Sequence, residues 1–326
     1  MNLNLTKIIF ITLMMFSSLI SISSSNWLSM WMGLELNLFT FIPILNFKMS
    51  IYSIESTMKY FLIQAFASII LLMFLINQSL FFLIHINMMI IIPLLMKLSL
   101  MPFHLWLPSM IEGLNWMSCF LLMTWQKITP MIMISYLNLN KLFILFIVMI
   151  SLNNLFGMNQ NSLRKILAMS SINNSSWMLI MILINEILWI HYFMIYSILN
   201  LMIMYILWIY KINYINQLKF FNFNFFLKMN MLMLILSIMG LPPMLGFMMK
   251  WMLIKMLIYN KMIIILMLLI SLTILNLYFY LKLTYFLLFN FNLFNKWYLQ
   301  NKKNNNFNNI LFMNFFSLFI NYLIFF

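Results

Sequence analysis

Four ionisable side chains stand near the middle of long apolar stretches of this sequence. They are Glu35, Lys97, Lys127 and Lys250. A charge at the centre of a lipid bilayer costs roughly 3 kcal/mol, so four such residues indicate a function. Burial disfavours the charged form of lysine and a nearby carboxylate favours it, so a lysine that changes partners can take up and release a proton. The four residues therefore predict a proton relay.

Glu35 is the one carboxylate placed in the middle of an apolar stretch. We hypothesise that it pairs with Lys97 and modulates the protonation of that lysine. The alternative role for Glu35 is that of a structural counter-ion. Lysines near helix ends usually extend to the membrane surface, but an ammonium group in the middle of a span cannot easily reach that surface. Lys97, Lys127 and Lys250 are therefore expected to serve the relay.

Two further residues are candidates for the same path. His104, between Pro102 and Trp106, either relays protons or forms a hydrogen bond at a helix break. Lys59 lies near a helix end, where it either extends to the membrane surface or takes up protons. The sequence leaves both choices open.

The composition excludes a water-soluble enzyme. Of 326 residues, 65% are hydrophobic and 7% are charged, which is too little charge to solvate a globule of this size. The net charge of +14 lies mostly in short loops, which indicates membrane topology rather than nucleic acid. The three histidines are far apart and Cys119 is the one cysteine, so we expect no metal site and no bound cofactor.

Long apolar runs predict an all-α, polytopic membrane helix bundle of about eleven transmembrane helices, because only helices or closed barrels satisfy their backbone in lipid. The runs span residues 5–24, 26–46, 56–77, 80–108, 114–137, 140–158, 165–185, 188–210, 229–258, 261–288 and 308–326. The asparagine-rich stretch 289–307 is expected to be a polar linker before the last helix. We expect one membrane domain over 1–326.

Loop charges predict the orientation of the chain. With eleven spans, the loops on the side of the N-terminus carry ten basic residues: Lys7, Lys48, Arg164, Lys165, Lys211, Lys219, Lys228, Lys296, Lys302 and Lys303. The opposite loops carry Lys141, Lys255 and Lys261. Because basic loops stay on the side of synthesis, the N-terminus is expected to face that compartment.

Two runs are longer than a simple span and are interrupted by proline. The fourth contains Pro93, Pro102 and Pro108, and the ninth contains Gly240 followed by Pro242 and Pro243. Proline removes a backbone donor, so each helix should break near mid-membrane. Each is the fourth helix in a block of five, over 5–137 and 140–288, and a copied block of five must be inverted. Broken helices at matching places in inverted repeats indicate a transport path.

Several motifs resemble one family. Residues 96–108 read MKLSLMPFHLWLP, residues 124–130 read TWQKITP and residues 31–37 read WMGLELN, with GLPP at 240–243 and Lys250-Trp251 after it. This series is similar to the antiporter-like membrane subunits of the proton-pumping NADH:ubiquinone oxidoreductase, and to multisubunit cation/proton antiporters. The heavy use of Ile, Met, Asn and Phe resembles proteins from AT-rich mitochondrial genomes, such as those of insects.

The resemblance implies a location in the mitochondrial inner membrane, with the N-terminus in the matrix. It implies a path through Glu35 and Lys97 as a coupled pair, Lys127 as the central link and Lys250 at the second broken helix. The chain departs from many relatives at Ser109, where they carry a carboxylate, so no role is assigned to the nearby Glu112. The resemblance also implies that NADH, FMN, iron-sulfur clusters and ubiquinone are bound by other subunits.

The sequence thus predicts a proton-translocating subunit whose partners are other membrane subunits, protons and membrane lipids, with cardiolipin as a candidate. Two alternatives stay open: a free-standing cation/proton antiporter and a purely structural membrane subunit. Ion flux without NADH would identify the first. Tolerance of neutral residues at all three central lysines would identify the second.

Overall fold

The computed structural model describes residues 5–47, 50–81, 86–137, 160–185, 187–220, 225–242 and 244–288. These residues form helices, and their one β-type pairing is an isolated bridge between Ser162 and Tyr214. The predicted all-α class is therefore confirmed. The runs 140–158 and 308–326 and the linker 289–307 lie outside the described residues, so the count of eleven helices stays a prediction.

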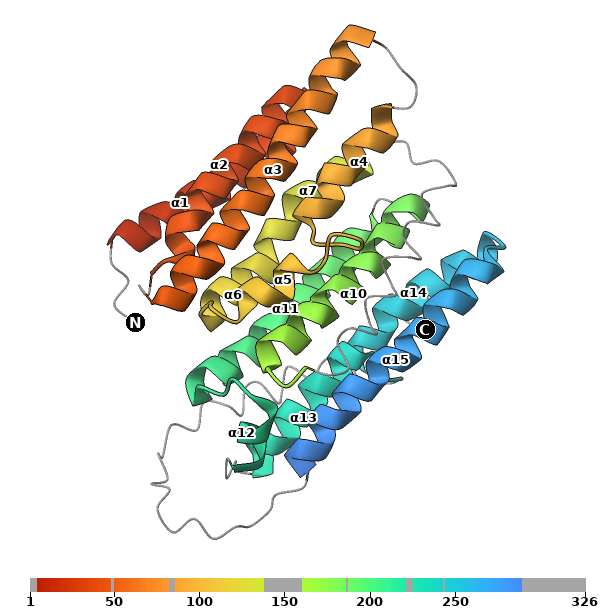
Figure 1. Ribbon diagram of the computed structural model, residues 1–326. Coiled ribbons are helices and arrows are strands. Elements are labelled where there is room, and N and C mark those ends of the chain that lie inside the picture. Colours follow the sequence, from red (N-terminus) through yellow and green to blue (C-terminus); the bar gives the residue numbers. More distant parts are fainter. Residues whose placement is uncertain are drawn as a thin grey trace. The chain divides into compact units, whose positions relative to one another are not determined.

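Figure 1 shows the helices in chain order. They are α1 (Leu5–Ser23), α2 (Trp27–Leu45), α3 (Ile51–Phe81), α4 (Ile86–Lys97), α5 (Trp106–Ile111), α6 (Trp116–Met123), α7 (Trp125–Ser135), α10 (Leu163–Ile184), α11 (Leu188–Tyr210), α12 (Ile215–Phe220), α13 (Phe225–Met239), α14 (Leu245–Tyr259) and α15 (Ile263–Leu288). In the described part of the chain, six helical segments are long and apolar enough to cross a membrane. The protein is therefore a multi-pass membrane protein.

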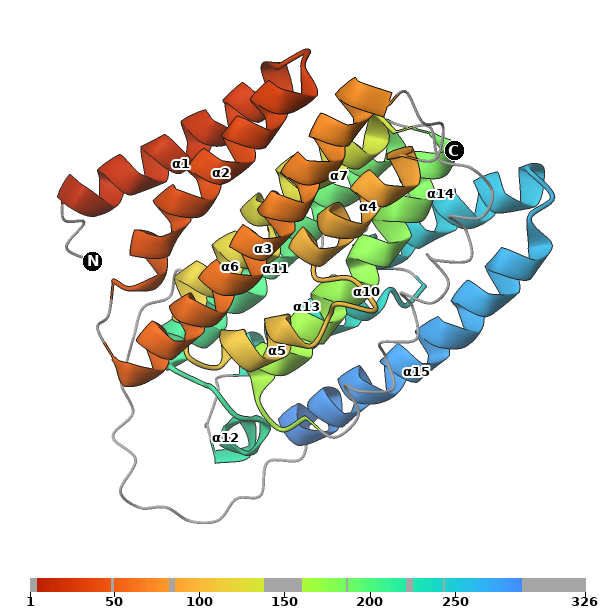
Figure 2. The same cartoon turned by 45° about the horizontal axis from the view of Figure 1, so that its top comes forward.

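The helices pack into two compact units. Unit 1 comprises Met1–Asn153 and Leu167–Trp189, and unit 2 comprises Asn154–Ile166 and Ile190–Phe326. Within unit 1, α2 packs between α1 and α3, while α3 also contacts α4 and α5 (Figure 1). Within unit 2, α13, α14 and α15 pack against one another, and α14 and α15 form an antiparallel hairpin (Figure 2).

Small residues let α1 and α2 approach closely. Gly33 lies against Ser21, and a Cβ added to Gly33 would be 2.7 Å from the Ser21 Cβ. Ser21 remains hydrogen-bonded there because its hydroxyl donates to the Ser18 carbonyl, at 2.7 Å. Asn37 follows Gly33 by one helical turn and is therefore buried on the same face, with 2% of its surface exposed.

The predicted interruption of the fourth run is present. Helix α4 ends at Lys97, Ser99 adopts a left-handed backbone with φ 57°, and α5 begins at Trp106. Pro93 lies inside α4, so the break follows Lys97 rather than Pro93. The predicted start of this run at residue 80 is wrong, because α3 continues to Phe81.

The ninth run is also interrupted, as predicted. Helix α13 ends at Met239, Gly240 takes φ 76°, and α14 begins at Leu245. Glycine tolerates this left-handed backbone without steric strain. Pro242 is in the connection, whereas Pro243 lies outside the described residues.

The fifth run has an interruption that the sequence did not predict. Thr124 separates α6 from α7, with φ −117° and ψ −75°. Its backbone N–H and its hydroxyl both donate to the Phe120 carbonyl, at 3.0 and 2.7 Å, so the two groups share one acceptor at this point. The irregularity places Gln126 and Lys127 in the first turn of α7.

Candidate proton-relay site

Lys97 is the last residue of α4 and is 9% exposed. Glu35, half-buried in α2, acts on it electrostatically, but the two side chains do not form a direct ion pair. The hypothesised coupling of Glu35 to Lys97 is thus of longer range than a contact pair. The Lys97 carbonyl accepts a hydrogen bond from Gln64 of α3, at 3.4 Å.

Lys127 is 3% exposed in the first turn of α7. Its ammonium group donates to the main-chain carbonyl of Ser171 in α10, at 2.8 Å. The surrounding segment of α10 is polar although the helix is buried: six side chains are less than 9% exposed there, namely Ser170, Ser171, Asn173, Asn174, Ser175 and Ser176. Lys127 therefore binds the backbone of α10 within a polar segment of that helix.

One small cavity lies between Lys97 and Lys127. Both lysines line it, and the space open to the centre of a water molecule is about 20 Å³. This is enough for roughly one water molecule. Polar side chains in its wall are Asn37, Tyr60, Gln64, Ser99, Gln126 and Thr129. The structure thus brings two of the predicted relay lysines to one shared cavity.

Two amides in the wall of this cavity bind each other. Asn37 Nδ2 donates to Gln126 Oε1 at 3.0 Å, and Gln126 Nε2 donates back to Asn37 Oδ1 at 3.1 Å. The Tyr60 hydroxyl also reaches Gln126 Oε1, at 3.4 Å. The reciprocal pair joins α2, which carries Glu35, to α7, which carries Lys127.

Lys250 belongs to unit 2 and is 7% exposed in α14. Its ammonium group donates to the Met239 carbonyl at 2.7 Å, at the end of α13. The position four residues after Met239 is Pro243, which has no N–H to complete the helical bond. Gly240 makes room, because a Cβ there would lie 2.8 Å from the Lys250 nitrogen. The break thus supplies the lysine with an acceptor.

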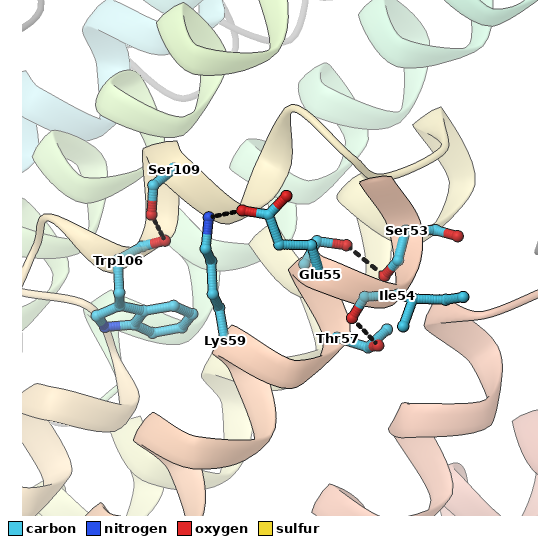
Figure 3. A network of polar contacts seen from close by, with 8 residues as sticks. Ser53, Ile54, Glu55, Thr57, Lys59, Trp106 and Ser109 are labelled. Carbon is cyan, nitrogen blue, oxygen red and sulfur yellow. Dashed lines mark hydrogen bonds and ion pairs between the residues drawn. The ribbon is translucent and has the colours of Figure 1, made fainter. Parts of the chain in front are cut away.

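His104 and Lys59 differ in their surroundings. His104 is 4% exposed in the connection between α4 and α5, at the predicted break. Lys59 forms an ion pair with Glu55 at 2.6 Å, with side chains 41% and 58% exposed (Figure 3). In that view Lys59 lies beside α5, which carries Trp106 and Ser109. Lys59 is therefore at the surface of unit 1, whereas His104 is inside.

The sequence reasoning missed the uncharged polar residues of the site. These polar residues lie inside apolar runs of the sequence, which marks them as candidates: Asn37, Gln126 and the segment 170–176. The pairing of Asn37 with Gln126 could not be predicted from the sequence, because the two residues come together only in the folded structure.

The ionisable groups of the site are three lysines and one glutamate. Among the residues that the structure describes, no three His, Cys, Asp or Glu side chains lie together in a way that would hold a metal ion. Three buried amines with a carboxylate at the edge are instead a set of exchangeable proton-binding groups. This chemistry is that of an ion-translocating membrane protein.

Comparison with known proteins gives the same class. Residues 24–276 match the family described as NADH:quinone oxidoreductase/Mrp antiporter, TM. The chain is 44% identical over 325 residues to NADH-ubiquinone oxidoreductase chain 2 of Aedes aegypti, covering 95% of this chain and 94% of that one. It is 44% identical to the protein of the same name from Anopheles gambiae, covering 76% and 75%. The chain therefore belongs to the NADH-ubiquinone oxidoreductase chain 2 family.

Solved structures share the fold. A chain of respiratory complex I from Thermus thermophilus superposes with a TM-score of 0.78 at 19% identity, covering 86% of this chain and 70% of that one. A chain of the Mrp complex from Dietzia gives a TM-score of 0.71 at 13% identity, covering 84% and 59%. The predicted family resemblance is confirmed, including its similarity to insect sequences.

Proposed function

We propose that this chain is a core membrane subunit of the proton-pumping NADH:ubiquinone oxidoreductase in the mitochondrial inner membrane, and that it carries protons. Its family membership and the six membrane-type segments among the described residues support this function. NADH, FMN, iron-sulfur clusters and ubiquinone belong to other subunits in this proposal. Its partners are neighbouring membrane subunits and lipids, with cardiolipin as a candidate.

The observation that carries the proposal is the shared cavity of Lys97 and Lys127. Two buried lysines that line one water-sized space cannot both stay charged without a large free-energy cost, so protonation of one favours proton release from the other. Glu35 biases Lys97 from the edge of the unit, and Lys250 serves as the third relay group. His104 and Lys59 are additional proton-exchange groups in this scheme.

The electrochemical work sets the scale of the mechanism. Moving one charge across the membrane takes about 2.3 kcal/mol per 100 mV. A proton-affinity change of one pH unit supplies about 1.4 kcal/mol, so several coupled lysines share the work. The driving step is a change in the action of Glu35 on Lys97.

Glu35 is placed where another subunit can deliver that change. Its neighbours on α2, Met32, Leu36 and Phe39, are exposed large hydrophobic residues. Within a membrane this face meets lipid or another membrane subunit. A carboxylate at its edge is therefore open to the field of a neighbouring subunit.

The finer architecture is part of the same proposal. It comprises eleven membrane helices in two inverted five-helix repeats, 5–137 and 140–288, followed by the linker 289–307 and a last helix at 308–326. The N-terminus faces the matrix. The two broken runs support this layout, since they occupy the fourth place of each repeat.

Lys97→Met tests the function. In the assembled complex reconstituted in liposomes, we expect proton pumping coupled to NADH oxidation to fall at least about ten-fold, because methionine fills the site without binding a proton. Lys255→Met is the matched control, since Lys255 is exposed on α14. Full pumping by the Lys97 variant would exclude the proposed relay.

The second candidate function is a free-standing cation/proton antiporter, which the fold shared with the Mrp chain favours. Ion flux measurements separate the two functions. The chain alone in liposomes would exchange Na⁺ or K⁺ for protons without NADH if it were an antiporter. We expect transport only in the complex, driven by NADH oxidation.

A further inference from the structure

The reciprocal amide pair of Asn37 and Gln126 lies in the wall of the cavity that Lys97 and Lys127 share. Asn37 is 2% exposed, and both residues line the cavity with Lys97 and Lys127. Each amide donates to and accepts from the other, at 3.0 and 3.1 Å. The hydrogen bonds of the pair therefore involve neither lysine.

Two other polar groups at the cavity are not satisfied by protein atoms. The Lys97 ammonium makes no hydrogen bond to the described residues. The Thr129 hydroxyl is 1% exposed and has no partner among these residues either. Buried polar groups are nearly always hydrogen-bonded, and a water molecule in the cavity would serve both.

We propose that the Asn37–Gln126 pair is a positioning element that holds a water link between Lys97 and Lys127. This inference rests on the proposed function of the chain as a proton carrier. The pair fixes the spacing of the cavity walls, because it ties α2 to the first turn of α7. Amide groups bind no proton near neutral pH, so they shape the link without trapping the proton that passes along it.

The position of the Asn37–Gln126 pair in the chain gives it a second role in the proposed relay. Asn37 follows Glu35 by two residues in α2, and Gln126 directly precedes Lys127 in α7. A displacement of α2 that accompanies a change at Glu35 is therefore carried by two hydrogen bonds to the helix of Lys127. The pair thus couples Glu35 to Lys127 without binding the proton itself.

The test uses the complete complex, purified and reconstituted in liposomes. Asn37→Leu and Gln126→Leu each remove the pair while keeping side-chain volume. We expect coupled proton pumping to fall about ten-fold, because a small misplacement of proton-transfer groups is enough for such a loss. The H₂O/D₂O rate ratio should rise at least two-fold as proton transfer becomes rate-limiting. The double variant should pump no worse than either single variant, since both remove one interaction.

Two further variants separate positioning from simple packing. Asn37→Gln combined with Gln126→Asn exchanges the two amides, restores the pair and should return pumping to within two-fold of the original. Trp31→Phe is the matched control, because it removes another hydrogen bond of α2, from Trp31 Nε1 to the Ser68 carbonyl at 3.0 Å. This control should leave pumping and the isotope ratio unchanged. If the leucine variants do not assemble, Asn37→Ser takes their place with the same expectation.

Full pumping by the assembled leucine variants would overturn the inference. So would an exchanged pair that assembles without recovering activity, or a Trp31 variant with the same defect. Lys97→Met and Lys127→Met are measured in parallel. If these two lose pumping while the amide variants keep it, the inference fails and the proposed function stands. If the lysine variants also keep full pumping, the proposed function itself fails.

Discussion

Unit 1 and unit 2 accommodate a buried lysine in different ways. In unit 1, Lys97 and Lys127 line a cavity whose wall combines polar and apolar side chains. In unit 2, Lys250 binds a main-chain carbonyl at the end of a broken helix, next to a glycine. The cavity wall in unit 1 is formed by side chains, which substitution can change, although Lys127 also donates to a main-chain carbonyl. The environment of Lys250 is formed by backbone atoms, so the position of its hydrogen-bond acceptor depends on where α13 ends.

The acceptors of Lys127 and Lys250 sharpen this contrast. Both lysines donate to carbonyl oxygens, at 2.8 and 2.7 Å. The Ser171 carbonyl belongs to a continuous stretch of α10 and also takes part in the helix, whereas the Met239 carbonyl is left over by the break. We infer that Lys250 is the more firmly held of the two, and that Lys127 exchanges partners more readily.

The largest effect is expected from removing the backbone-held amine. Lys250→Met should lower coupled proton pumping at least about ten-fold, because it removes the amine that binds the Met239 carbonyl at the α13–α14 break. Pumping and NADH oxidation are measured together in the reconstituted complex. Lys255→Met on the same helix is the control and should change neither. Normal pumping with methionine at position 250 would remove unit 2 from the proposed path.

Gly240→Ala tests whether backbone conformation positions Lys250. At φ 76° an alanine costs roughly 1–2 kcal/mol, and its Cβ would lie 2.8 Å from the Lys250 nitrogen. We expect pumping per assembled complex to fall about five-fold, since misplacing a proton-transfer group by 1 Å is costly. Equal yields of assembled complex are confirmed by native gel electrophoresis.

Gly33→Ala is the matched glycine substitution in unit 1, for comparison with Gly240→Ala. Its Cβ would meet Ser21 in the α1–α2 contact, whereas a Cβ at Gly240 would meet Lys250. We expect less assembled complex but normal pumping per complex. If Gly33→Ala and Gly240→Ala behaved alike, the two glycines would share a packing role and the contrast between the units would be lost.

The charged part of the site was predictable from sequence, because a lysine in an apolar run has few structural explanations. Lys97, Lys127 and Lys250 are each buried in the structure, as expected. The two helix breaks were also predictable in position, since proline and glycine mark them. The break after Lys97 was displaced from Pro93 because α4 tolerates that proline inside the helix.

The acceptors and the amide pair were not predictable. The carbonyls of Ser171 and Met239 have no sequence signature, because every residue carries one. The break at Thr124 contains neither glycine nor proline, so nothing in the pattern marked it. Asn37 and Gln126 lie 89 positions apart, and their pairing depends on the packing of α2 and α7 in unit 1.

Substitution of Lys59 tests whether the proposed proton path of unit 1 extends to the surface. Its exposed ion pair with Glu55 contributes only about 0.3–0.5 kcal/mol to stability, so Lys59→Gln should leave assembly unchanged. If Lys59 takes up protons, pumping should fall by about two-fold, since water can partly replace an exposed group. Glu55→Gln, which breaks the same ion pair but keeps the lysine, should not show this loss. Equal behaviour of both variants would reduce Lys59 to a surface ion pair.

The smallest effect is expected from Ser171→Ala, which separates side chain from backbone at the Lys127 acceptor. The Ser171 hydroxyl donates to the Ala168 carbonyl at 2.7 Å, while the Lys127 ammonium binds the Ser171 carbonyl. Alanine keeps that carbonyl, so pumping should stay within about two-fold of the original, as neutral hydroxyl hydrogen bonds contribute only about 1 kcal/mol. A loss as large as that of Lys127→Met would mean that the hydroxyl carries the proton onward. The Ser171 hydroxyl would then accept the proton from Lys127. In that case Lys127 would depend on a side-chain acceptor and Lys250 on a backbone acceptor.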